Sequence, residues 1–151
     1  MAGNRFRART AQIATGTSAK TILQIIAASN HAVMIDRVSI SFEGTSNTAA
    51  PIQVDFVRQT DAGTMGTSAS SIVKDPDDWA ETIQTTIRDT SSSEPSGTVV
   101  LESFLVHPQG GMDWCAQRLE QRIKIGGGDR LGIRVTAPAD VDCIVSVTGE
   151  E

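Results

Sequence analysis

Nucleophilic catalysis is the first chemistry to consider, because the chain has two cysteines, Cys115 and Cys143, and two histidines, His31 and His107. A catalytic Cys or Ser needs a base within hydrogen-bond reach, usually His. Spacing alone allows a dyad of Cys115 with His107, but no nucleophile-elbow or other flanking motif accompanies it. Each histidine lies at the end of an expected strand beside turn residues. We therefore interpret both as rim residues and expect that the chain is not an enzyme.

Metal and phosphate sites are the second possibility. Asp75, Asp77 and Asp78 could offer oxygens to Ca²⁺, but Pro76 interrupts the run and no following Glu completes a loop signature. An exposed acidic turn is the commoner meaning of such a run. The glycines at 126–128 lack the spacing of a phosphate-binding loop and lie between two apolar segments, which is typical of a tight turn. We expect no metal and no cofactor.

The elements that must position these residues are short segments in which apolar and polar residues alternate. Each segment ends in a cluster of Gly, Ser, Thr, Asn or Pro, and the clearest are 37–42, 52–56 and 131–135. Because side chains on a strand point to opposite faces with period two, each segment predicts a half-buried strand. Many such strands at short spacing favour a sandwich or a barrel.

We predict one all-β domain, a single-domain jelly-roll or β-sandwich of about 8–10 antiparallel strands. Residues 1–17 are an N-terminal arm or edge strand, and residues 18–151 form the sandwich. The alternation changes phase at Asp36-Arg37, which predicts a β-bulge in a long strand over 31–42. We expect the strand over 51–59 to pair with that long strand. The segments 131–136 and 142–148 should form a closing pair.

The amino-acid composition and the charge disfavour several classes of function. Only 4% of the residues are aromatic and Tyr is absent, which disfavours a stacking platform for sugars or bases. The first 35 residues contain Arg5, Arg7, Arg9 and Lys20 and no acid, a charge of +4 within a chain of net charge −5, so the remainder carries −9. An acidic body argues against nucleic-acid binding. The basic start suggests either a tail that lies on another acidic surface or a short disordered end.

Cellular location follows from two absences in the sequence. No apolar stretch is long enough to cross a membrane, and no apolar run follows the first residues as in a signal peptide. We therefore expect a cytosolic product with no membrane partner. Cys115 and Cys143 are too few for a disulfide framework. We interpret them as reduced thiols, with Cys143 a small core hydrophobe.

The two tryptophans, Trp79 and Trp114, lie in polar, loop-like segments away from the clear strands. One interpretation is that each folds back to close an end of the sandwich. The other is that each anchors an interface, because Trp is enriched among the residues that dominate binding energies.

Several strand and turn phrases carry a resemblance to a known group of proteins. They are Ala19–Ile25, Phe42–Ser46, Leu101–Phe104, His107–Gly111 and Arg130–Pro138. These phrases resemble jelly-roll capsid decoration proteins, also called cement proteins, of tailed bacteriophages. The resemblance covers about residues 18–151 and contains no catalytic signature.

The resemblance implies a homotrimer on the exterior of an icosahedral head, bound to the major capsid protein after shell expansion and assembled in the host cytoplasm. Repeated weak contacts across such a lattice provide avidity. Arg5, Phe6, Arg7 and Arg9 are then the candidate contacts of the N-terminal arm, with Trp79 and Trp114 as further candidates for capsid or inter-subunit contacts.

Three alternatives belong to other functional classes. A phage tail or fibre module that binds a receptor or glycan has the same kind of fold, although the low aromatic content disfavours it. A cupin-like enzyme needs a His-x-His set and a further His, which two isolated histidines do not supply. A head or tail connector would bind a ring instead of covering the shell, so copy number per particle separates it from a decoration protein.

Overall fold

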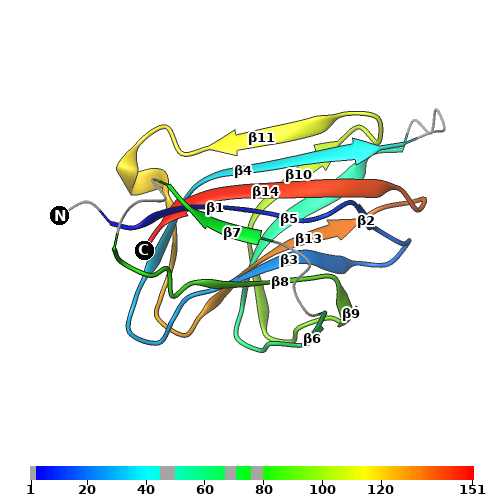
Figure 1. Ribbon diagram of the computed structural model, residues 1–151. Coiled ribbons are helices and arrows are strands. Elements are labelled where there is room, and N and C mark those ends of the chain that lie inside the picture. The colour runs from blue at the N-terminus through cyan, green and yellow to red at the C-terminus, as the bar shows by residue number, and fades with distance from the viewer. Residues whose placement is uncertain (1–2, 45–49, 67–70, 76–79) are drawn as a thin grey trace.

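The computed structural model describes residues 3–44, 50–66, 71–75 and 80–151. Within these ranges the chain forms strands and one 3₁₀ turn, η1 (Leu119–Gln121). Two antiparallel sheets pack face to face as a β-sandwich, and the two termini lie at the same end (Figure 1). The all-β sandwich that the alternating segments predicted is confirmed.

The larger sheet, sheet A, has seven strands. Its main path is β11 (Gly111–Cys115), β4 (Val33–Glu43), β14 (Asp142–Glu150), β1 (Arg5–Arg9) and β7 (Ser71–Lys74), while β12 (Ile123–Ile125) pairs with β4 and β2 (Ile13–Ala14) with β14. Sheet B has the order β10 (Thr98–Val106), β5 (Ile52–Gln59), β13 (Arg130–Thr136), β3 (Lys20–Ile26) and β8 (Thr86–Asp89). A short ribbon joins β6 (Thr64–Met65) to β9 (Ser91–Ser93).

The strand order is that of a jelly-roll. Four antiparallel pairs are nested along the chain: β1 with β14, β3 with β13, β4 with β11, and β5 with β10. The pairs alternate between the sheets, as when one long hairpin is wrapped around a core. This nesting gives the two four-strand paths β1-β14-β4-β11 and β3-β13-β5-β10 within the observed sheets.

The turn of that wrapped hairpin, between β5 and β10, contains a long insertion. The insertion supplies β7, which pairs with β1, and β8, which pairs with β3, so it extends both sheets on the same side of the sandwich. It also supplies the β6–β9 ribbon, which lies below β3 and β8 in Figure 1. Strand β8 is thus the edge strand at the end of sheet B opposite β10.

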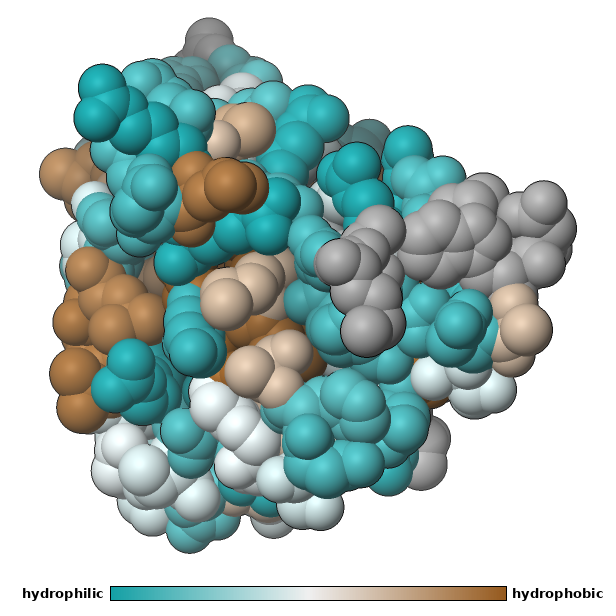
Figure 2. Space-filling model, turned by 90° about the vertical axis from the view of Figure 1, so that its left-hand side faces the viewer, coloured by the Kyte–Doolittle hydropathy of each residue, from teal (hydrophilic) through white to brown (hydrophobic). Residues whose placement is uncertain are grey.

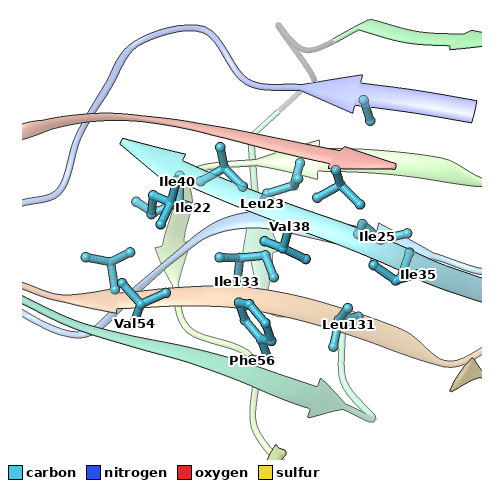
Figure 3. Packing of buried hydrophobic residues seen from close by; sticks show 14 of the residues in the cluster. Ile22, Leu23, Ile25, Ile35, Val38, Ile40, Val54, Phe56, Leu131 and Ile133 are labelled. Carbon is cyan, nitrogen blue, oxygen red and sulfur yellow. The ribbon is translucent and has the colours of Figure 1, made fainter. Parts of the chain in front are cut away.

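The core lies between the sheets and is built from Val, Ile, Leu and Phe. Strand β4 contributes Ile35, Val38 and Ile40, and their side chains meet those of Phe56 and Ile133 from the opposite sheet (Figure 3). The ring of Phe56 also packs 5.3 Å from that of Phe104, measured between centroids. Burial of these side chains supplies the main force that holds the two sheets together.

The phase change at Asp36 is a bulge, as the sequence predicted. Arg37 pairs with Thr148 and Ile35 pairs with Gly149, so Asp36 is the extra residue on β4. Because of this extra residue, Ile35 and Val38 both face the core although three positions separate them.

Two predicted strand pairings are wrong. Strand β5 pairs with β10 and β13 in sheet B, whereas β4 belongs to sheet A. Strands β13 and β14 likewise lie in opposite sheets, although only a short connection separates them. In both cases consecutive strands cross from one sheet to the other, which is what the nested order requires, so a short connection does not form a hairpin here.

Candidate binding surfaces

The basic start of the chain is part of the sheet. Arg5–Arg9 form β1, which has β14 on one side and β7 on the other, so it is an interior strand instead of the arm or edge strand that the sequence predicted. Burial alternates along it. Arg5, Arg7 and Arg9 are exposed, while Phe6 and Ala8 face the core. The strand therefore places three arginines in a row on the outer face of sheet A.

Neighbouring strands add to this row through their register. Arg7 pairs with Thr148, and Thr148 pairs with Arg37, so the two arginines flank a threonine across three adjacent strands. In the next row Arg9 pairs with Ser146, which pairs with Ser39. Two strand spacings, about 10 Å, separate the Cα atoms of Arg7 and Arg37. Short hydroxyl side chains therefore lie between long cationic ones.

This arrangement forms a hollow of about 540 Å³ on the outer face of sheet A. We call it the arginine hollow. It is lined by Arg7, Ala8, Arg9, Arg37, Ser39, Val73, Ser146, Val147 and Thr148. The serines and the threonine form its floor because they are short, and the arginines form its walls.

Two of the three arginines are held by carboxylates. Arg7 donates from Nε to Asp75 Oδ2 at 2.8 Å, and Arg37 binds both oxygens of Asp113, from Nε at 2.7 Å and from Nη2 at 2.6 Å. The hydrogen bonds between Arg37 and Asp113 raise the pKa of Arg37 and lower the pKa of Asp113. Both arginines remain well exposed, with 70% and 55% of their side-chain surface accessible.

The other two arginines of β1, Arg9 and Arg5, differ from this pair. Within the part of the chain that the structure describes, the guanidinium of Arg9 has no hydrogen-bond or ion-pair partner. Arg5 lies nearer the end with the termini, where its Nη2 is 3.8 Å from Asp36 Oδ2. There Arg122 joins Asp36 and Glu150, at 2.6 and 3.0 Å. Arg5 thus belongs to a separate ion-pair group that ties η1 to β4 and β14.

Phe6 and Trp114 occupy positions other than those expected of exposed contacts. Phe6 has no accessible surface and belongs to the core cluster, because it faces inward on β1. Trp114 lies on β11 opposite Val38, so its assignment to a loop is wrong. Its half-buried ring meets Phe56 edge-on, 5.7 Å between centroids. Trp79 lies outside the described residues.

The candidate dyad of Cys115 and His107 is not assembled. His107 Nδ1 accepts a hydrogen bond from Gln109 N in the turn that ends at Gly111. Strand β11 carries Cys115 four residues beyond Gly111, about 13 Å along the strand. Cys143 is buried, as predicted, and burial raises the pKa of its thiol to about 12. The two thiols are free.

Of the acidic run, only Asp75 lies within the described residues. Asp75 pairs with Arg7, while Asp77 and Asp78 lie outside the described residues. Among the residues that the structure describes, no three His, Cys, Asp or Glu side chains gather as metal ligands. The glycines at 126–128 form the predicted turn, in which Asp129 N donates to Gly126 O and Gly128 has a φ of +82°.

A second surface lies along β10, an edge of sheet B. Six large hydrophobic side chains of the described residues are exposed, and three of them, Val99, Val100 and Leu105, lie on this nine-residue strand. The register shifts between Val100 and Glu102, so the edge is bulged. A bulge and an exposed charge limit the addition of another strand to an open edge. We therefore expect β10 to contact a partner through its side chains and not by pairing with another strand.

The outer face of sheet B contains a buried polar network that the sequence analysis did not predict. Gln24 Nε2 donates to Gln59 Oε1 at 2.8 Å, and Gln59 Nε2 donates to Thr21 Oγ1 at 2.9 Å. Glu94, from the insertion, accepts hydrogen bonds from Thr21 and Ser91. Thr21, Gln24 and Gln59 have no accessible surface. A Cβ at position 132 would lie 2.5 Å from Gln59 Nε2, so the glycine there makes room for the network.

A buried ion pair lies on the same face. Asp55 is 1% exposed and accepts hydrogen bonds from Gln53, from Ser103 and, at 2.8 Å, from Arg134 Nη2. Burial raises the pKa of Asp55, but the hydrogen bonds from these three side chains and the charge of Arg134 outweigh it, so the pKa is lowered. The pair is thereby held in its charged form.

No protein-family model, no curated protein and no solved structure matches this chain. Among the described residues, no helix has the length and hydrophobicity needed to span a membrane. The fold and the surfaces described above are therefore the basis for assigning a function.

Proposed function

We propose that this protein is a capsid decoration protein of a tailed bacteriophage, which binds the outside of the phage head as a homotrimer and stabilises the shell without catalysis. The observation that supports it is the jelly-roll order of the strands, an architecture that recurs in viral capsid proteins. It agrees with the resemblance of the strand and turn phrases to cement proteins. The partners are the major capsid protein and further copies of the chain, assembled in the host cytoplasm.

The β10 edge is the surface that we assign to contact between copies. It collects half of the exposed large hydrophobic side chains of the described residues on a single strand. At the end of the sandwich with the termini, by contrast, the residues drawn in colour form small, separate hydrophobic groups among hydrophilic ones (Figure 2). Exposed hydrophobic side chains gathered on one element are more typical of an interface than single scattered ones are.

The first experiment measures mass in solution and then binding to expanded, undecorated heads, with the complex imaged by electron microscopy. We expect a particle of about three times 16.0 kDa that occupies three-fold positions on the shell. A monomer that does not bind heads would contradict the proposal.

A matched pair of variants tests the role of β10. Leu105 and Leu119 are 71% and 70% exposed, but only Leu105 lies on β10. We expect Leu105→Glu to convert the trimer to a monomer and Leu119→Glu to leave the trimer intact. Equal trimer content in the two variants would exclude the β10 edge as the contact between copies.

Glycan binding by a tail or fibre module is the second candidate, and one observation favours it. A hollow of about 240 Å³ is lined by hydroxyl and charged side chains, namely Thr15, Thr17, Ser18, Lys20, Ser91, Ser92 and Glu94. Such groups hydrogen-bond sugars, although no aromatic ring lines the hollow. Specific signals on a glycan array, lost in Lys20→Ala, would favour this function over shell binding.

A further inference from the structure

The arginine hollow has donors that its own carboxylates do not use. A guanidinium carries five N–H groups in a planar fork. Asp113 occupies the Nε and Nη2 edge of Arg37, and Asp75 occupies the corresponding edge of Arg7. Each guanidinium therefore retains donors for a second carboxylate, while Asp75 and Asp113 fix its orientation.

Arg9 adds an unneutralised charge to the hollow. Asp75 and Asp113 balance Arg7 and Arg37, and among the described residues no carboxylate pairs with Arg9. The hollow thus has one cation in excess and two further cations with free donors. A bound carboxylate would complete charge-assisted hydrogen bonds that the described residues leave unmade.

The floor of the hollow suits an extended polypeptide. Ser39, Ser146 and Thr148 are small and lie across two adjacent strands, so no long side chain rises between the arginine walls. Their hydroxyl groups can donate to or accept from a backbone laid on the sheet. The hollow therefore combines recognition of carboxylates with a surface that a chain segment can lie on.

The charge of the whole chain selects an acidic protein over a nucleic acid as the occupant. The body beyond residue 35 carries −9, against +4 on the residues before it. A nucleic acid needs an extended basic surface to displace its counterions, and the acidic body opposes this. A short acidic segment needs only the hollow, and the negative body repels it from other orientations.

We propose that the arginine hollow docks an extended, carboxylate-rich segment of a partner protein. One carboxylate pairs with Arg9, and others bind the free edges of Arg7 and Arg37. Assigning that segment to the major capsid protein rests on the proposed function, and it would make the outer face of sheet A the face that meets the shell.

The first test titrates ¹⁵N-labelled protein with poly-L-glutamate at low ionic strength and follows amide resonances. We expect shifts at Ser39, Ser146 and Thr148. Arg9→Glu should weaken binding about three- to tenfold, the size expected for exposed charge pairs. Arg88→Glu makes the same charge change at an exposed position of sheet B and should change binding by about twofold or less.

Three results would overturn the proposal. Equal weakening by Arg9→Glu and Arg88→Glu would mean that only net charge matters. Shifts confined to residues outside the hollow would place the binding elsewhere. Tighter binding of a DNA duplex than of poly-L-glutamate to the same residues would identify the partner as nucleic acid. Unfolding midpoints of both variants, expected to match the parent, exclude misfolding as the cause.

The second test repeats the comparison on expanded, undecorated heads. Weaker binding of Arg9→Glu than of Arg88→Glu supports docking of the shell in the hollow. If both variants bind heads as the parent does, the shell does not use the hollow, although the proposed function stands. If the parent does not bind heads while poly-L-glutamate occupies the hollow, the capsid assignment fails and the acidic-segment site stands.

Discussion

The outer faces of the two sheets are both polar, but they are built differently. On sheet B, polar side chains such as Gln24, Gln59 and Asp55 are buried, with Gln24 bonded to Gln59 and Asp55 bonded to Arg134. On sheet A the polar side chains of the arginine hollow, such as Arg9, are exposed. The same residue classes therefore have two roles. Buried polar groups that bond to each other help to specify the structure, whereas exposed groups with free donors are available to a partner.

Two ion pairs of the same chemistry make this comparison measurable. Asp55 and Arg134 on sheet B have 2% and 22% of their side-chain surface exposed, whereas Asp113 and Arg37 on sheet A have 47% and 55%. Solvent therefore screens the second pair much more than the first. Substitutions at the two sites should therefore differ mainly in their effect on stability.

The largest effect is expected from Asp55→Ala. It removes the carboxylate and leaves the charge of Arg134 uncompensated, along with the donors of Gln53 and Ser103. We expect a loss of about 2–3 kcal/mol in the free energy of unfolding, less than for a fully buried pair because Arg134 keeps some contact with water. Urea denaturation measures it. Asp113→Ala is the control and should leave the midpoint unchanged, and an equal loss in both variants would remove the distinction between the faces.

The next effect is expected from Gln59→Ala. Two buried hydrogen bonds are then lost, and Thr21 Oγ1 keeps only Glu94 while Gln24 Nε2 keeps only Ala62 O, at 3.4 Å. Each of the two lost hydrogen bonds is expected to cost about 0.5–1.5 kcal/mol. Thermal or urea unfolding measures the loss, with the exposed Gln117→Ala as the control. A loss no greater than that of the control would mean that water enters and satisfies the network.

A smaller effect is expected at acid pH, again from Asp55. Because its folded pKa lies below the ordinary value of 3.8, the charged carboxylate stabilises the fold above that pH, and this contribution is lost as pH falls through the folded pKa. The difference in unfolding free energy between the parent and Asp55→Asn should therefore be constant near neutral pH and shrink below about pH 4. A difference that grows on acidification would mean that the folded pKa is raised instead.

Strands were predictable from the sequence because alternation is a local property. The segments 37–42, 52–56 and 131–135 lie in β4, β5 and β13, and the phase change at Asp36 marks a real bulge. Pairing was not predictable in the same way, since alternation tells which side chains share a face and not which strand lies alongside. Nested pairing joins β1 to β14 across almost the whole chain, so the shortest connections gave the wrong partners.

The candidate site was predictable only in part, for the same reason. Arg7 and Arg9 are exposed, and their role as contacts stays a prediction, but Phe6 between them is buried because β1 alternates. Arg37 was missed because its approach to Arg7 depends on β14 lying between β1 and β4. Trp114 was placed in a loop because β11 is only five residues long and starts at a glycine.

The smallest effect on stability is expected from Arg9→Ala, and it tests the comparison from the side of sheet A. Arg9 is exposed and has no partner among the described residues, so its removal should change the unfolding free energy by no more than about 0.5 kcal/mol. Added salt should not alter this difference, because no ion pair among the described residues is lost. A loss above 1 kcal/mol would mean that Arg9 has a structural role like that of Arg134. A substitution on the exposed face of sheet A should thus weaken binding to an acidic partner and leave stability unchanged. A substitution on the buried face of sheet B should lower stability instead.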